Sequence, residues 1–136
     1  MNSKIKKTSS RLSGFVNSYK ASNIANIESS IRFHMDEIKN KLSELLAMEI
    51  DNRDLFVLLQ KSYYILNEST LDYFDILIQF GESFKTSIII SKTENIPGIL
   101  TDSRMKMIVY HYLELAEKLE DRRVNSLAIE IGELLD

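Results

Sequence analysis

Apolar residues recur at helical spacing along most of this chain. In the first long segment, about residues 22–48, they are three, four or seven positions apart and form one seam: Ile24, Ile27, Ile31, Ile38, Leu45 and Met48. This spacing predicts an amphipathic helix with one buried stripe. Gly14 leaves open whether "RLSGFVNSYK" extends this helix or forms a short helix of its own.

Further helices are predicted over about 52–66, 70 to the late 80s, 103–120 and 121–135. The segment "LFVLLQKSYYIL" is apolar around most of its circumference, which predicts a central helix or one covered on a second side by another subunit. Residues 103–120 carry the clearest seam, which consists of Met105, Ile108, Tyr112, Leu115 and Leu119. No Gly or Pro separates this segment from 121–135, so one long bent helix is an alternative to two.

The segment "TSIIISKTENIPGILTD" interrupts the helical pattern. Three consecutive Ile favour extended structure, and Pro97–Gly98 marks a turn. We expect a helix end followed by a loop, since a lone hairpin would have no sheet to join, but the pattern leaves open whether residues 86–91 are helical or extended. Together the segments predict an all-α, single-domain bundle of four to five helices over residues 14–136.

Composition narrows this picture. Four Gly and one Pro are too few for a turn-rich β architecture. The absence of Cys excludes disulfides and thiolate metal sites and fits a reducing compartment. Purely apolar runs are only a few residues long, which predicts no membrane span. We therefore expect a cytoplasmic protein.

Charge is distributed unevenly along the chain. Residues 1–27 contain five basic residues and no acidic one, whereas the whole chain has a net charge of −3. A mobile basic N-terminal tail is predicted over residues 1–13, followed by an acidic body. Such a body suits a basic protein partner, and contact with nucleic acid is expected only through the tail.

Each of the two His is followed three positions later by Glu, namely Glu37 after His34 and Glu114 after His111. Di-iron bundles use the opposite order, Glu-x-x-His, on two helices, so the sequence predicts no metal site and no cofactor. His34 lies on the stripe of its helix, which is typical of a partly buried ring that is hydrogen-bonded to a neighbour. Sensing of pH is the alternative, although the sequence identifies no partner for it.

Arg104 and His111 are the candidate catalytic pair. They stand seven residues apart on one helix face, roughly 10.5 Å along the axis, so His could act as acid or base while Arg stabilises a phosphodiester transition state. The stretch "RMKMIVYH" resembles the HEPN family of small all-helical ribonucleases, whose motif is an Arg, four to six residues and a His. Met105 departs from the polar residue that commonly follows the family's Arg. The resemblance implies a metal-independent ribonuclease with these two residues as its working pair.

Aromatic residues at helical spacing favour a different function. Interface cores are enriched in such side chains, and the candidate partner-binding residues are Phe56, Tyr63, Tyr64 and Tyr73. The leading hypothesis is therefore a non-enzymatic interaction module: a small helical regulator, chaperone or immunity-type partner. It would bind another protein, or a second copy of itself as a homodimer. The HEPN-like ribonuclease is the alternative.

Overall fold

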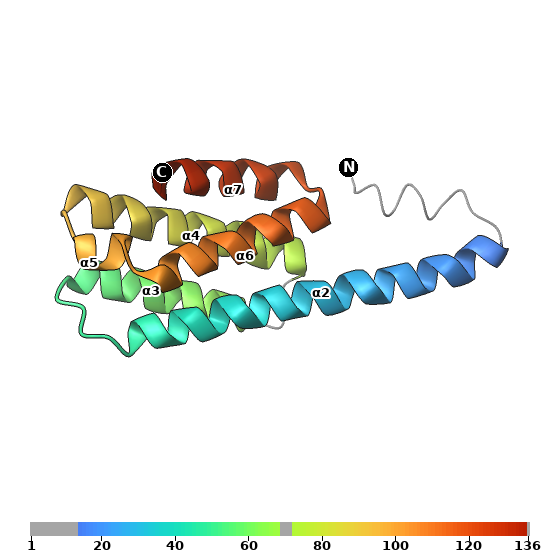
Figure 1. The fold of residues 1–136 in the computed structure, drawn as a ribbon, viewed down its shortest axis with the longest axis horizontal. Helices are drawn as coiled ribbons and strands as arrows, with labels where there is room; N and C mark the ends of the chain where they lie inside the picture. The colour runs from blue at the N-terminus through green and yellow to red at the C-terminus, as the bar shows by residue number, and fades with distance from the viewer. Residues whose placement is uncertain (1–13, 69–71, 136) are drawn as a thin grey trace.

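The computed structural model describes residues 14–68 and 72–135, with side chains from residue 27 onward. This part of the chain forms six helices: α2 (Gly14–Leu46), α3 (Arg53–Leu66), α4 (Tyr73–Thr93), α5 (Pro97–Leu100), α6 (Ser103–Leu119) and α7 (Arg122–Leu135) (Figure 1). The predicted all-α class is confirmed. The helix count exceeds the upper limit of the predicted four to five by one, because the turn at Pro97–Gly98 forms the short helix α5. The predicted basic tail, residues 1–13, lies outside the described residues.

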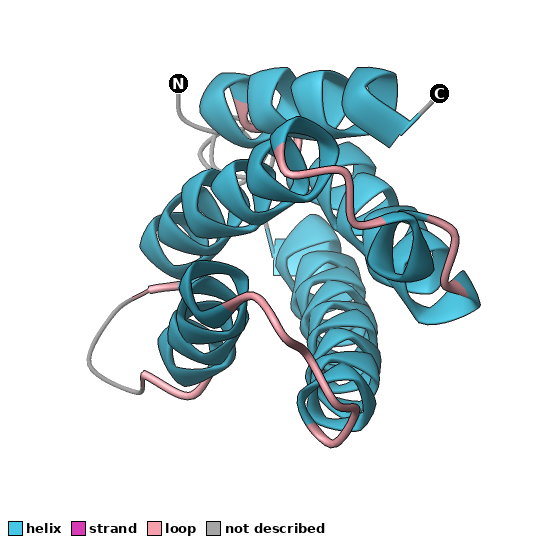
Figure 2. Ribbon diagram, turned by 90° about the vertical axis from the view of Figure 1, so that its left-hand side faces the viewer, coloured by secondary structure: helices cyan, strands magenta, loops and turns pink. Residues whose placement is uncertain are grey.

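The helices are arranged in three tiers (Figure 1). Helices α2 and α3 form the lower tier, α4 and α6 the middle tier, and α7 lies across the top. Accordingly, α6 packs against α2 below and α7 above, while α4 packs against α3 and α7. An end-on view shows the helices around a shared interior (Figure 2). The first turns of α2 extend beyond the other helices.

Side-chain caps fix where three helices begin. Asn52, Asp72 and Asp102 each accept a hydrogen bond from a backbone N–H in the first turn of α3, α4 and α6, respectively. These caps satisfy donors that a helix N-terminus leaves without partners.

The segment around the three Ile corrects the sequence prediction. Residues 86–91 are helical, and α4 continues to Thr93 instead of ending in a loop in the late 80s. By contrast, α6 and α7 are separate helices, because Glu120 adopts a left-handed conformation with φ of 53°. The alternative of one long bent helix is therefore wrong.

The core consists mainly of the predicted seams. Every residue of the seam on α6 is buried. Phe80 and Phe84 stack with ring centroids 5.4 Å apart, and Phe80 also contacts the Tyr112 ring at 5.6 Å. No helix of the described chain combines the length and the apolar character needed to cross a membrane. The buried stripe of α2 that faces α6 includes one polar residue, His34.

Candidate functional site

The two histidines of the chain lie side by side between α2 and α6. The Nδ1 atoms of His34 and His111 are 2.8 Å apart, although 77 positions separate the residues in the sequence. Their exposed fractions are only 7% and 6%. Each imidazole is therefore the hydrogen-bond partner of the other, across a helix–helix contact.

The helical seams explain this placement. His34 lies between Ile31 and Ile38 on the buried stripe of α2. His111 follows Ile108 by one turn on α6. Because residues three and four apart share a helix face, apolar packing of the two stripes brings the rings together.

Burial and nearby charges act on both rings. Desolvation lowers the pKa of His34, and positive charge on His111 and Lys118 lowers it further. The carboxylates of Glu114 and Glu37 oppose this lowering of the pKa to a smaller extent. Desolvation also lowers the pKa of His111, but the carboxylates of Glu37 and Glu114 oppose this shift. Glu37 Oε1 lies 4.0 Å from His111 Nε2, on the ring edge away from His34. The surroundings therefore favour His111 as the ring that takes up a first proton.

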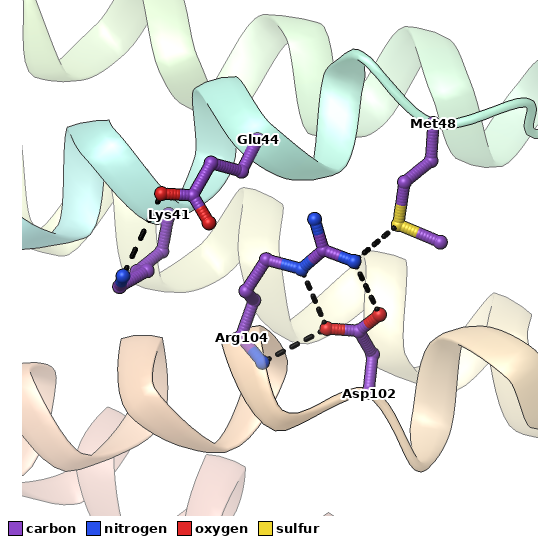
Figure 3. A network of polar contacts seen from close by, with 5 residues as sticks. All are labelled: Lys41, Glu44, Met48, Asp102 and Arg104. Carbon is purple, nitrogen blue, oxygen red and sulfur yellow. Dashed lines mark hydrogen bonds and ion pairs between the residues drawn. The ribbon is translucent and has the colours of Figure 1, made fainter.

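Arg104 belongs to a different cluster, at the N-terminus of α6 (Figure 3). Its Nε and Nη2 donate to the two carboxylate oxygens of Asp102, each over 2.9 Å, and Nη2 also lies 3.1 Å from Met48 Sδ. Hydrogen bonding to Arg104 lowers the pKa of Asp102, and the same bond raises the pKa of Arg104. Asp102 also accepts from the backbone N–H of Arg104, so this pair completes a helix cap.

The structure therefore gives the members of the predicted catalytic pair different partners. Arg104 is held by Asp102 and His111 by His34. Among the described residues, no hydrogen bond or ion pair joins Arg104 to His111. The HEPN-like ribonuclease remains a prediction from the sequence, and the contacts of these two residues lend it no support.

Exposed apolar side chains form a band beside the histidine pair. We define the apolar strip as Phe33 on α2, Met107, Tyr110 and Leu113 on α6, and Ile129 on α7. Its members lie on three neighbouring helices, and Phe33, Tyr110 and Ile129 are 56%, 55% and 59% exposed.

Ring contacts link two members of the strip to the histidine pair, and two other members share a hollow. The His111 ring contacts Phe33 and Tyr110, with centroid distances of 6.0 and 5.1 Å. The three members on α6 follow one another at steps of three, and Leu113 and Ile129 line one open hollow between α6 and α7. The charged residues along this hollow are Glu117 and Glu120, so its edge is acidic.

The four predicted partner-binding residues do not all face solvent. Tyr64 is 63% exposed, whereas Phe56, Tyr63 and Tyr73 are half-buried. Tyr64 lines a hollow along α3 together with Val57, while Tyr73 lines another hollow beside Arg32. The two hollows share Glu68 at their edges. The assignment of a binding role to these residues stays a prediction.

Sequence reasoning missed both the histidine pair and the strip. The pair has no local signature, because its members come from distant segments. The strip left a weak signal, since Met107, Tyr110 and Leu113 are apolar residues on the face of α6 opposite its buried seam. Within the described ranges, no three metal-ligating side chains converge, and the two histidines are not joined by a third ligand.

Comparison of the chain with protein-family models, curated proteins and solved structures found no match. The fold and the site thus define the class of molecule: an all-helical bundle with an apolar strip over a buried histidine pair.

Proposed function

We propose that the protein is a cytoplasmic, non-enzymatic interaction module that binds a basic segment of another protein on the apolar strip. A helical regulator, chaperone or immunity-type partner would use such a surface. The observation that carries the proposal is the clustering of exposed apolar side chains. Of the large apolar residues that are exposed in the described chain, most belong to the strip; the others are Val57, Tyr64 and Ile89.

Charge indicates the kind of partner. Carboxylates edge the hollow between α6 and α7, and the body of the protein is acidic overall. A partner segment with apolar side chains for the strip and basic side chains for this edge complements both features. The second candidate binding surface lies on α3, where Val57 and Tyr64 are exposed.

A matched pair of double variants tests the proposal. Tyr110→Lys with Ile129→Lys places positive charge on the strip, and Val57→Lys with Tyr64→Lys does the same on α3. All four residues are exposed, so folding should tolerate both changes, which circular dichroism would check. The wild-type protein and each double variant would be used to capture bound proteins from a lysate of the source cells, and the captured proteins would be quantified by mass spectrometry.

We expect one captured protein to fall about tenfold or more with the strip variant, as for loss of an interface hot spot, and to persist with the α3 variant. Its recovery should also fall as salt is raised, because the charge attraction is screened. Equal recovery with both variants, or loss with the α3 variant alone, would contradict the strip as the binding surface. Sedimentation of the purified protein tests whether a second copy of the chain occupies the strip. A dimer of the wild-type protein that becomes monomeric in the strip variant would mean that the strip binds a second copy and not a basic partner protein.

A further inference from the structure

We propose that His34 and His111 form a proton-operated latch between α2 and α6, closed at neutral pH and loosened in mildly acidic solution. The feature that carries this inference is the 2.8 Å separation of two Nδ1 atoms from different helices, both of them buried. They are the two His side chains of the described residues, and their Nδ1 atoms face each other.

Proton positions determine whether the pair can hold together. With both rings neutral, one Nδ1–H donates and the other Nδ1 accepts. With one ring protonated, the cation still donates to the neutral Nδ1 of its neighbour. With both rings protonated, two N–H groups and two positive charges face each other across 2.8 Å. The second proton therefore removes the hydrogen bond and replaces it with repulsion.

The charged groups around the pair determine which of the two rings is protonated first. From α2, Glu37 and Lys41 act on the rings, and from α6, Glu114 and Lys118 do so. Glu37 lies against Nε2 of His111 and stabilises a first proton there. Desolvation, the charge on His111 and Lys118 all oppose a second proton on His34. His34 is thus the ring whose protonation opens the latch.

The latch lies directly under the apolar strip. The Phe33 ring contacts both imidazoles, with centroids 5.2 and 6.0 Å away, and Tyr110 contacts His111. Loosening of α2 from α6 would separate Phe33 from the strip members on α6. This regulatory consequence rests on the proposed function of the strip, whereas the latch itself does not.

The chain contains only two His, so an untagged protein allows a direct test by NMR titration of the imidazole signals. His34→Asn and His111→Asn assign the signals, and Asn keeps a neutral polar atom near the position of Nδ1. We expect two separated steps, with His111 titrating first and His34 below the ordinary histidine pKa of about 6.5. In His34→Asn, the pKa of His111 should rise or stay unchanged. Independent titration of both rings near 6.5 would overturn the proposal.

Amide hydrogen exchange tests the mechanical step. After correction for intrinsic rates, acidification from about pH 7.5 through the range below about 6.5 in which the His34 signal titrates should increase opening of α2 and α6 several-fold. The α3–α4 contact is the internal control, because it is joined by a buried hydrogen bond between the neutral hydroxyls of Ser62 and Ser83 at 2.8 Å. His34→Asn should abolish the difference between the two contacts.

Equal opening of both contacts in the wild-type protein, or an unchanged response in His34→Asn, would overturn the latch. So would marked stabilisation by Zn²⁺ that requires both His, since the pair would then be a metal site. These measurements need no partner protein. A failed titration therefore rejects the latch alone, and failed capture by the strip rejects the binding function alone.

Discussion

Gly81 on α4 lies directly beside the Tyr112 ring of α6 in the core. A Cβ added at Gly81 would lie 2.3 Å from the Tyr112 hydroxyl oxygen and 3.0 Å from Leu127 Cδ1. The Tyr112 ring is fully buried, and its hydroxyl donates to the Leu77 carbonyl over 2.7 Å. This buried phenol leaves no room for a larger residue at position 81, so Gly81 is required by packing.

We predict that Gly81→Ala lowers the free energy of unfolding by about 1–3 kcal/mol, as expected for overpacking. Gly132→Ala is the matched control, because Gly132 also lies within a helix but has open space around its Cβ position. It should stabilise the protein by about 0.5–1 kcal/mol through helix propensity. Urea denaturation measures both changes. Similar effects of the two substitutions would contradict the packing assignment.

For individual residues, the sequence predicts which apolar side chains are buried but not which polar side chains contact each other. Tyr112 was expected in the buried seam of α6, because helical spacing alone places it there, and this is confirmed. The contact of His34 with His111 was not predictable, since it depends on the packing register of two helices distant in sequence.

At the scale of elements, α4 shows where local preference fails. Its three consecutive Ile have high β propensity, yet Ile88 is buried in the core and Ile90 is half-buried. Tertiary packing of this kind overrides the weak propensity of a short run. The helix ends only at Thr93, with Glu94 as its C-cap and Asn95 following with φ of 54°. A positive φ is tolerated by Asn better than by most residues, and such an end is hard to recognise in a sequence.

The cap of α6 yields a second prediction. Asp102→Ala should lower the free energy of unfolding by about 1–2 kcal/mol, because it removes both a helix cap and the anchor of Arg104. Since the pKa of Asp102 is lowered in the folded state, this stabilisation is present above the ordinary Asp value of about 3.9 and is lost as the pH falls below it. Urea denaturation at pH 7 and pH 3 measures the difference.

A double-mutant cycle with Arg104→Ala isolates the contribution of the pair. The two substitutions together should cost less than the sum of their separate effects, because each breaks the same contact. Additive effects would reject the pairing. Cleavage of single-stranded RNA that is lost in both Arg104→Ala and His111→Asn, with folding intact, would instead support the HEPN-like function.

For the whole molecule, the buried histidines predict a pH dependence of stability. Both pKa values are lowered in the folded state, so the unfolded chain binds more protons. Stability from the pair is therefore fully present above a pH of about 6.5 and declines as the pH falls below it. Urea midpoints at several pH values should show this decline, and His34→Asn should reduce it. Equal slopes for the variant and the wild-type protein would contradict the prediction.

The sequence predicted the helical class correctly but not the surface that the bundle leaves uncovered. The second apolar row of α6 lies opposite its buried seam and stays exposed because α2 and α7, which pack against this helix, do not cover it. The broad apolar character of α3 was likewise visible, but only the structure shows that Val57 and Tyr64 remain exposed there. Single helices can be predicted from periodicity, whereas the faces left uncovered follow from the assembled tiers.

Site-specific photo-cross-linking tests the binding surface most directly. A photoreactive residue would replace Leu113 on the strip in one variant and Tyr64 on α3 in another, and both would be irradiated in the source cells. We expect one partner to be cross-linked from position 113 through a segment rich in basic residues, and no such product from position 64. The same product from position 64 alone, or no product from position 113, would contradict this prediction.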